Sequence, residues 1–290
     1  MSDHRAPLIT SRANPTIKQI RALATRKERE RSGLFFVEGI RLVTEAVQVG
    51  AEIVQGVVAP DLLKGTVGRE VAAALRAQGV PCLDVSADVF AGLSAKEGPQ
   101  GLGAVVRQRW ERLDDRGRQE AGLGWVALDA VQDPGNLGTI LRTSDAVGAA
   151  GVILVGPTTD PYDPAAVRAS MGAIFTQRLV RAAWTEFAAW KQQVDITLIG
   201  ASDKAVADYQ AVTYRPPLVL FMGSERQGLS AEQQALCDGM VRIPMVGRSD
   251  SLNLAVATGV ILYEIFNQQR AMSSEQRAAS SEQRVMSDAD

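Results

Sequence analysis

The sequence contains one histidine, His4, and two cysteines, Cys82 and Cys237, in 290 residues. A single histidine near the start of the chain excludes catalysis by a histidine triad or by a metal held on several histidines. The two cysteines lie far apart, and neither has a Cys or His neighbour at metal-ligand spacing. We therefore predict two reduced, apolar cysteines and no zinc or other metal site.

Long apolar runs are also missing. No stretch approaches the length that a bilayer-crossing helix needs, and residues 1–10 contain no apolar segment typical of a secretory signal. We therefore expect a cytoplasmic protein without a membrane partner. The 46% of hydrophobic and 22% of charged residues are typical of a compact protein, and the length favours two domains over one.

A strong positive charge is absent as well, because the formal net charge is −2. This excludes a uniformly basic coat for nucleic acid, but the charge is unevenly distributed. Residues 1–31 contain eight basic and three acidic residues. Such a segment can contact phosphates, although a solvated helix face explains the same charges.

The first part of the chain predicts a small α/β domain over residues 1–110. The expected elements, in order, are a basic helix at 17–31, a strand at 34–37, a helix around 43–47, a strand at 53–59, a helix at 67–78, and strands at 81–85 and 104–107. Residues 111–122 are charged and have few apolar groups to bury. We predict a linker there.

Residues 123–270 predict a second α/β domain. A strand at 125–128, a helix at 136–147 and a strand at 151–155 form a βαβ unit, which indicates a parallel sheet. Continuous apolar runs at 196–199 and 218–222 are typical of strands covered on both faces. Residues 271–290 are polar and repeat Ser-Ser-Glu-Gln-Arg, so we expect a flexible tail.

The first motif runs from Asp129 to Asp145 and contains Asp133-Pro-Gly-Asn-Leu-Gly138. It predicts a strand end, a Pro-Gly turn and a helix that Asn136 caps. Its glycines do not have the three-glycine spacing of a dinucleotide-binding loop. Arg142 lies beside the apolar stripe of this helix, and taken alone it is an ordinary surface arginine.

The second motif covers residues 217–230, a buried strand that leads into Gly223-Ser-Glu225. Ligands of open α/β sheets bind at the carboxyl ends of strands, where Gly223 permits close approach and Glu225 supplies a charge. Ser230 and Gln233 form a capping box for the next helix. The alternative is a simple chain turn with a solvated glutamate.

The third motif covers residues 241–264 and predicts a strand, a polar loop and a helix that is apolar nearly all round. Such a helix must be buried, either in the core or in a dimer interface. Ser251 and Asn253 stand just before it, and by residue type alone they are helix caps.

Together the three motifs resemble the SpoU class of RNA ribose 2′-O-methyltransferases, in the same order along the chain. The resemblance rests on Asp133-Pro-Gly-Asn-Leu-Gly138 with Arg142, on Gly223-Ser-Glu225, and on Ile243-Pro-Met with Ser251-Leu-Asn253. Ser11-Arg-Ala-Asn-Pro15, Phe36-Val-Glu-Gly39 and Pro99-Gln-Gly101 are similar to the ribosomal-protein-like RNA-binding domain that many members carry.

This resemblance implies an α/β domain with a deep trefoil knot, which connection rules alone would not suggest. It also implies a homodimer through the C-terminal domain and S-adenosylmethionine as the cofactor. The residues implied to bind the cofactor are Gly223, Ile243, Leu252, Met222 and Pro244. No metal is needed, because methyl transfer from a sulfonium is an in-line displacement.

The resemblance further implies that Arg142 accepts the proton of the ribose 2′-hydroxyl, with Asn136, Glu225, Ser251 and Asn253 arranging the reaction. Since a guanidinium stays protonated, an alternative is that Arg142 binds phosphate or stabilises the developing alkoxide. The N-terminal domain is then expected to hold RNA through the phosphate contacts of Arg12, Lys18, Arg21 and Arg26.

The two-domain arrangement favours ribosomal RNA as the substrate. A transfer-RNA ribose methyltransferase and a non-catalytic RNA-binding or ribosome-assembly factor remain as alternatives, and the intact motif residues argue against the second of these. A nicotinamide-dependent dehydrogenase is disfavoured because the three-glycine fingerprint and a catalytic histidine are both missing.

Overall fold

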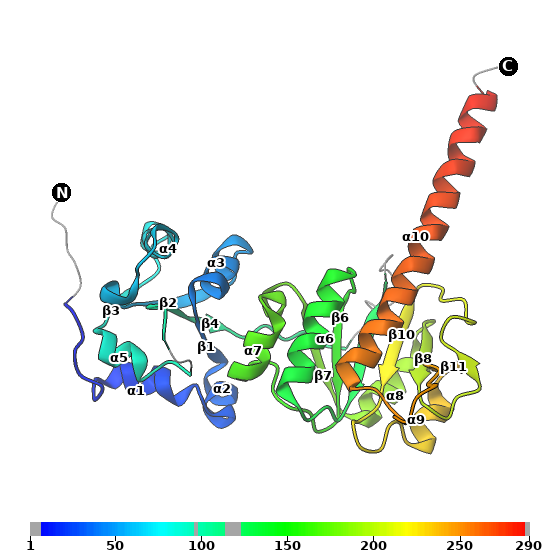
Figure 1. The fold of residues 1–290 in the computed structure, drawn as a ribbon, viewed down its shortest axis with the longest axis horizontal. Coiled ribbons are helices and arrows are strands. Elements are labelled where there is room, and N and C mark those ends of the chain that lie inside the picture. The colour runs from blue at the N-terminus through cyan, green and yellow to red at the C-terminus, as the bar shows by residue number, and fades with distance from the viewer. Residues whose placement is uncertain (1–6, 96–97, 114–122, 288–290) are drawn as a thin grey trace. The chain divides into compact units, whose positions relative to one another are not determined.

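The computed structural model describes residues 7–95, 98–113 and 123–287, with the backbone alone for residue 273 and residues 275–287. The chain divides into two compact units, whose elements are labelled in Figure 1. Unit 1 contains residues 1–109 and 160–176, and unit 2 contains residues 110–159 and 177–290. Residues 160–176 thus group with the N-terminal part of the chain, which differs from the predicted domain boundaries. The predicted linker falls mostly on residues 114–122, outside the described residues.

Unit 1 is built on a four-stranded sheet with the order β1-β4-β2-β3. The strands are β1 (Leu34–Glu38), β2 (Ile53–Val58), β3 (Cys82–Asp84) and β4 (Leu102–Arg107). β4 is antiparallel to β1 and β2, and β3 is parallel to β2. Each strand overlaps one predicted from the sequence.

The helices of unit 1 are α1 (Pro15–Ala22), α2 (Arg26–Ser32), α3 (Ile40–Gln48), α4 (Thr66–Ala77), α5 (Ala87–Ala91) and α7 (Pro164–Ser170), with 3-10 turns at Pro60–Leu62 and Ala173–Phe175. The single helix predicted over residues 17–31 is wrong, because Thr25 is extended, with φ −94° and ψ 139°, between α1 and α2. The break allows Leu23 and Arg29 both to be buried, with exposed fractions of 5% and 1%.

Arg29 is a charged residue buried in the interior of unit 1. Its Nε donates to Asp160 Oδ2 at 2.7 Å, and its Nη1 donates to the carbonyls of both Leu23 and Ala24. Asp163 lies 3.4 Å from the same guanidinium. A buried charge that is paired and fully hydrogen-bonded in this way is tolerated, whereas a lone one is not.

Residues 160–176 also bury apolar groups within unit 1. The ring of Tyr162 packs against Phe35 of β1 with 4.6 Å between centroids. The Tyr162 hydroxyl donates to the carbonyl of Arg109 at 2.6 Å and accepts from the Arg109 N–H at 2.8 Å. The segment is therefore part of the core of unit 1 rather than a surface loop.

Unit 2 contains a seven-stranded sheet with the order β7-β6-β5-β10-β8-β11-β9. The strands are β5 (Trp125–Asp129), β6 (Gly151–Val155), β7 (Arg178–Ala182), β8 (Thr197–Ala201), β9 (Ala207–Asp208), β10 (Leu218–Met222) and β11 (Gly239–Arg242). All of the described pairings in this sheet are parallel. The α/β class and the parallel sheet predicted from the sequence are confirmed.

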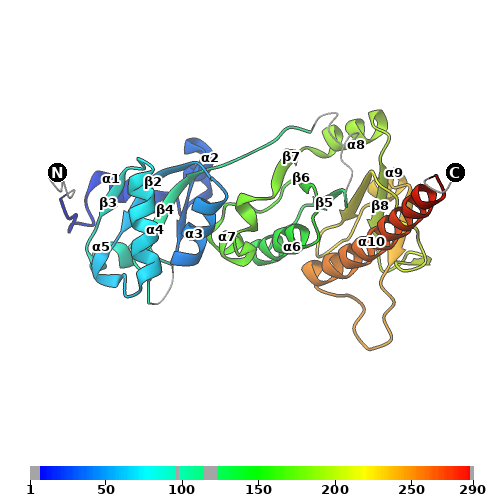
Figure 2. The same cartoon turned by 90° about the horizontal axis from the view of Figure 1, so that it is seen from above.

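Helices cover both faces of this sheet (Figure 2). They are α6 (Pro134–Ala146), α8 (Trp184–Gln193), α9 (Ala231–Leu236) and α10 (Leu254–Ser287). α6 and α10 pack together on one face, and α8 and α9 lie on the other (Figure 2). The capping box predicted for Ser230 and Gln233 is present at the start of α9.

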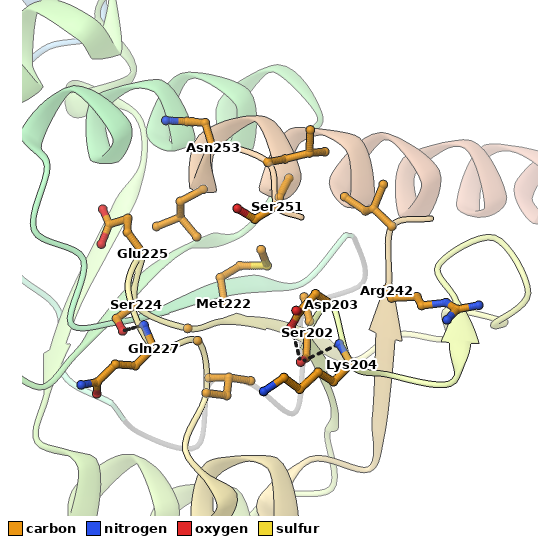
Figure 3. A pocket seen from close by; sticks show the side chains of 18 of the residues that line it. Ser202, Asp203, Lys204, Met222, Ser224, Glu225, Gln227, Arg242, Ser251 and Asn253 are labelled. Atoms are coloured by element: carbon orange, nitrogen blue, oxygen red, sulfur yellow. Dashed lines mark hydrogen bonds between the residues drawn. The ribbon is translucent and has the colours of Figure 1, made fainter. Parts of the chain in front are cut away.

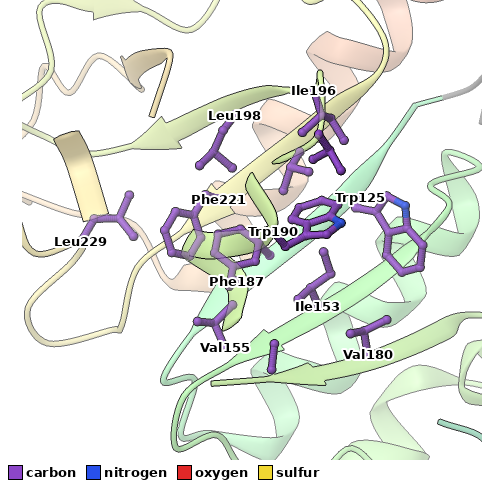
Figure 4. Close-up of a cluster of buried hydrophobic side chains, with 14 residues drawn as sticks. Trp125, Ile153, Val155, Val180, Phe187, Trp190, Ile196, Leu198, Phe221 and Leu229 are labelled. Carbon is purple, nitrogen blue, oxygen red and sulfur yellow. The ribbon is translucent and has the colours of Figure 1, made fainter. Parts of the chain in front are cut away.

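The face of the sheet beneath α8 carries a cluster of buried aromatic side chains (Figure 4). Phe187 and Trp190 of α8 pack against each other with centroids 5.7 Å apart, and Phe187 lies 5.2 Å from Phe221 of β10. This cluster fixes β10 at the centre of the sheet, and β10 leads directly into the second motif.

The predicted flexible tail differs from the structure, in which α10 continues through residues 271–287. Extending an existing helix adds one hydrogen bond for each residue fixed and avoids the cost of nucleation. The tail contains Ala, Glu, Gln and Arg, which are good helix formers, so it extends the apolar helix of the third motif. Residues 288–290 lie outside the described part.

Candidate cofactor and catalytic site

A pocket of about 700 Å³ lies in unit 2 at the carboxyl ends of β8, β10 and β11 (Figure 3). Residues 201–204 follow β8, residues 223–229 follow β10, and residues 241–254 lead from β11 into α10. The carboxyl edge of a parallel sheet is where open α/β folds bind ligands. The second and third motifs therefore meet where chemistry is expected.

Gly223 begins a tight turn at the end of β10. A Cβ at this position would lie 2.2 Å from the backbone carbon of Gly228 and 2.4 Å from the Leu229 nitrogen, so only glycine fits. The Gly228 N–H donates to the Ser224 carbonyl at 3.0 Å and closes the turn. This turn projects the Glu225 side chain toward α6.

The carboxylate of Glu225 faces the first turn of α6. It accepts from the backbone N–H groups of Gln132 and Asp133 at 3.4 and 3.5 Å, and from Asn136 Nδ2 at 3.4 Å. The free N–H groups and the positive dipole end of a helix N-terminus attract an anion. The charge of Glu225 is thereby balanced although its side chain is exposed.

Asn136 and Asn253 link the first and third motifs. Asn253 Nδ2 donates to Asn136 Oδ1 at 2.9 Å, and Asn253 Oδ1 accepts from the Ala255 and Val256 N–H groups at the start of α10. Asn253 is thus the helix cap that its residue type predicted. Its second bond extends a network that runs through Asn136 to Glu225.

The prediction that Asn136 caps α6 is wrong. The N-cap is Asp133, whose carboxylate accepts from the Asn136 N–H at 2.7 Å. The Pro-Gly pair at 134–135 forms the first turn of the helix, because proline is favoured at the first helical position. The Asn136 side chain is therefore available for Glu225 and Asn253.

The wall of the pocket combines buried apolar side chains with polar ones. Met222, Leu229, Val241, Leu254 and Ile261 contribute apolar surface and are at most 9% exposed. Ser202, Asp203 and Lys204 contribute polar groups at the end of β8 (Figure 3). Sequence reasoning missed these three, although their place after a predicted strand was a usable signal.

Most of the predicted site residues line this pocket. They are Asn136, Met222, Gly223, Glu225, Ile243, Ser251, Leu252 and Asn253. Pro244 stands between lining residues but is not one itself. Arg142 is also not among them: it is exposed on α6, and its guanidinium makes no hydrogen bond or ion pair with a described residue.

The predicted RNA-binding residues lie on α1, on α2 and just before α1, in unit 1. Arg12 is engaged with Asp88, and Arg26 with Glu30. Arg21 donates to the Gly92 carbonyl at 3.3 Å, and Lys18 is exposed. Lys18 and Arg21 therefore offer charge that no carboxylate balances within the described residues.

The pKa values of Asp129 and Cys237, two groups near the sheet of unit 2, are raised. Burial raises the pKa of Asp129, at the end of β5, and a hydrogen bond with Gln233 opposes this shift. Burial, followed by the charge of Asp238, raises the pKa of the Cys237 thiol to about 12. Cys237 is therefore protonated at neutral pH and is a poor nucleophile.

Among the described residues, no group of three or more His, Cys, Asp and Glu side chains is arranged to hold a metal ion. No described helix combines the length and the hydrophobicity needed to cross a bilayer.

Two family models match the chain. The SpoU rRNA Methylase family matches residues 125–263, and the MRM3-like substrate binding domain matches residues 14–104. The 23S rRNA (uridine(2479)-2′-O)-methyltransferase of Streptomyces viridochromogenes is 34% identical over 90% of this chain and 92% of its own length. This chain belongs to the SpoU rRNA methylase family. The resemblance inferred from the three motifs is confirmed.

Further members of the family support the assignment. The 23S rRNA (guanosine(2553)-2′-O)-methyltransferase of Bacillus subtilis is 30% identical over 89% of this chain and 98% of its own length. A crystal structure of an AdoMet-bound rRNA methyltransferase from Sinorhizobium meliloti matches with a TM-score of 0.81 and 39% identity. The match covers 89% of this chain and 97% of that one.

The pocket of this SpoU family member fits S-adenosylmethionine. Its volume lies within the roughly 300–1,000 Å³ of small-molecule sites. Its lining combines an apolar surface at Met222, Leu229 and Ile261 with polar groups at Ser202, Asp203 and Lys204, and a cofactor with an aromatic ring and a charged amino acid group needs both kinds of surface.

Proposed function

We propose that the chain transfers a methyl group from S-adenosylmethionine to a ribose 2′-hydroxyl of ribosomal RNA. The observation that carries this proposal is the network joining Asn253, Asn136 and Glu225 at the rim of the pocket. It links all three motifs at the edge of the sheet where a cofactor fits. The relatives named above act on 23S ribosomal RNA, which favours this substrate over transfer RNA.

The residues that would hold the cofactor are the turn at Gly223, Ile243 and Leu252 between β11 and α10, and the apolar wall at Met222 and Leu229. Bound there, S-adenosylmethionine supplies an electrophilic methyl carbon on a sulfonium. We extend the cofactor set to Ser202 and Lys204, which line the same pocket. Pro244 is proposed to shape the segment between its lining neighbours Ile243 and Met245.

The network residues are proposed to position the ribose. The Asn136 amide is oriented by its partners on both sides, since Asn253 donates to its oxygen and its nitrogen donates to Glu225. Held in this way, polar groups can stabilise a developing charge without reorganisation. Ser251, which lines the pocket beside Leu252, supplies a further hydroxyl at the same rim.

Arg142 is proposed to contact the RNA at the reacting 2′-hydroxyl or at the adjacent phosphate. Its guanidinium is exposed and has no partner among the described residues, so it is available to an incoming ligand. Because a guanidinium remains protonated, it stabilises the alkoxide or holds a phosphate more readily than it removes a proton.

We also propose a homodimer through unit 2. Val256 and Tyr263 are large apolar residues that one face of α10 presents to solvent, and they are 51% and 48% exposed. A second copy would cover this stripe. Thr143, next to Arg142 on α6, faces Gly259 of α10, so Arg142 lies beside the proposed interface. We further propose that the backbone forms a trefoil knot at the third motif. We also propose that the protein acts in the cytoplasm.

Labelled S-adenosylmethionine with ribosomal RNA, transfer RNA and matched DNA as acceptors tests this function. We expect label on the ribose of ribosomal RNA only, and a loss of about 100-fold or more in rate for Arg142→Ala. Cofactor affinity measured by calorimetry should be unchanged in Arg142→Ala, because Arg142 does not line the pocket.

Arg215→Ala is the matched control, since Arg215 is an exposed arginine at the opposite, amino end of β10. Its activity should equal that of the wild type. If only transfer RNA accepted the methyl group, transfer RNA would be the substrate instead of ribosomal RNA. No transfer and no cofactor binding would instead indicate a non-catalytic RNA-binding factor.

A further inference from the structure

A second cavity of about 220 Å³ lies entirely within unit 1. Its walls come from α1, β1 with the start of α3, the residues after α5, and α7. This volume is below the roughly 300–1,000 Å³ of drug-sized ligands. It corresponds to about seven water molecules at about 30 Å³ each, which suits one planar ring system rather than a whole cofactor.

Glu38 is the one carboxylate among the residues that line this cavity. It is only 8% exposed, and one carboxylate oxygen, Oε1, accepts from the Ala95 N–H at 3.1 Å. Its second oxygen, Oε2, has no hydrogen-bond donor among the described residues. That oxygen can therefore accept from a donor group that enters the cavity.

Two arginines stand at the same cavity. The guanidinium of Arg168, in the last turn of α7, makes no hydrogen bond or ion pair with another described residue. The Nε of Arg21 donates to the Gly92 carbonyl at 3.3 Å, and its other guanidinium N–H groups remain available to a ligand. Phe36 adds an aromatic ring to the lining. An acceptor inside, cations at the wall and an aromatic ring match an RNA nucleotide, with its donor-bearing base, its phosphates and its flat face.

We propose that this cavity of unit 1 binds one unstacked RNA base that carries an exocyclic amino group, with Glu38 accepting from the amino group and Arg168 and Arg21 contacting the flanking phosphates. The inference rests on RNA being the substrate, and it adds a base-reading site away from the reacting ribose. Cytosine satisfies it, because its amino group donates to carboxylates. Uracil presents a carbonyl oxygen at that position and is repelled.

Short single-stranded oligonucleotides of cytidine and of uridine, used as separate probes of the full chain, test this site. We expect the wild type to bind oligocytidine about tenfold more tightly, as one good base contact provides. Glu38→Gln should abolish or reverse this preference, because its amide can keep the Ala95 bond while presenting a donor to the base. Glu52→Gln, an exposed glutamate outside the cavity, should leave the preference unchanged.

Arg168→Ala should lower the affinity for both oligonucleotides by the same factor. It should also reduce the slope of log affinity against log salt concentration by about one. Arg41→Ala, an exposed arginine that does not line the cavity, is its control. Equal affinity of the wild type for the two probes, or a preference that Glu38→Gln retains, would overturn the proposal.

Photocrosslinking of the wild-type chain tests the site even if the Glu38 variant fails to fold. Oligonucleotides containing 5-iodocytidine should crosslink the wild-type chain in a peptide that contains Phe36 or Arg168. Crosslinks confined to other peptides would contradict the site. Both measurements are independent of methyl transfer, so failure of the enzymatic assay and failure of the base-reading site give different results.

Discussion

At the scale of single residues, the side chains that carry the site were predicted better than their partners. Glu225, Asn136 and Asn253 were named from the motifs, and all three line one pocket. The cap of α6 was assigned to Asn136 instead of Asp133, because both residues are good caps and the Pro-Gly pair between them permits either reading. The hydrogen bond that the Asn136 N–H donates to the Asp133 carboxylate identifies Asp133 as the cap.

Arg142 shows a different limit at this scale. A sequence places it on a helix beside the apolar stripe, and the structure agrees that it is exposed. The position of an exposed side chain relative to a substrate depends on what binds there, which neither the helical period nor the isolated chain specifies. Its proposed role therefore depends on assays with RNA rather than on packing.

Asp129 provides a pH prediction. Burial raises its pKa above the ordinary value of 3.8, so the folded chain retains the proton to higher pH than the unfolded chain does. Asp129 therefore lowers the stability of the fold as the pH rises from 3.8 through the raised pKa. Asp129→Asn cannot ionise, so its stability relative to the wild type should increase over that interval and then level off.

Urea unfolding at a series of pH values measures this effect. The four tryptophans all belong to unit 2, as does Asp129, so tryptophan fluorescence reports on the relevant unit. Asp195→Asn, an exposed aspartate of unit 2, is the control. Parallel stability curves for Asp129→Asn and the wild type would show that the Asp129 carboxyl titrates alike in both states.

At the scale of elements, prediction succeeded for most strands but missed β7 and β9. β10 was predicted with its observed bounds, because both of its faces are buried and its apolar run is continuous. The break between α1 and α2 was not predicted, since the polar sequence there has no apolar period that a break would interrupt. It arises from the burial of Arg29 against Asp160, a contact between residues far apart in the chain.

The turn after β10 gives a prediction at the element scale. A methyl group at Gly223 would collide with the backbone of Gly228 and Leu229, so Gly223→Ala must shift the turn that carries Glu225. Such overpacking costs about 1–3 kcal/mol. We expect S-adenosylmethionine affinity, measured by calorimetry, to fall about tenfold or more.

Gly247→Ala is the matched control for this turn. A Cβ on Gly247 meets no atom within 4 Å, and Gly247 does not line the pocket although it belongs to the neighbouring loop. Its cofactor affinity should match the wild type. Wild-type affinity in Gly223→Ala would mean that the Gly223 turn does not shape the cofactor pocket.

At the scale of the whole molecule, the chain passes between the two units at residues 109–110, 159–160 and 176–177. Charge and hydrophobic period along the sequence indicated a single boundary near residue 110. They could not reveal that residues 160–176 leave unit 2, because Tyr162 and Ala166 are as apolar as core residues of either unit would be.

This interleaving predicts that residues 1–109 do not form a stable domain alone. Without residues 160–176, Arg29 loses its partner Asp160, and Phe35 loses the ring of Tyr162. Removing one partner of a buried ion pair costs about 3–5 kcal/mol. Circular dichroism should show no cooperative unfolding for the fragment 1–109.

Joining residues 160–176 to that fragment through a flexible linker should restore cooperative unfolding. In the full chain, Asp160→Ala should increase amide hydrogen exchange in α2, whereas Asp61→Ala, an exposed aspartate of unit 1, should not. A fragment 1–109 that unfolds as cooperatively as the extended one would contradict this account of unit 1.

The contribution of residues 160–176 to unit 1 also limits how substrate choice can be transplanted between family members. A chimera joined once, near residue 109, would combine the β1–β4 sheet of one parent with α7 of the other. Arg168 and Glu38, which share one cavity, would then come from different parents. An exchange of the proposed base-binding cavity between family members therefore requires two grafts, one at each segment of unit 1.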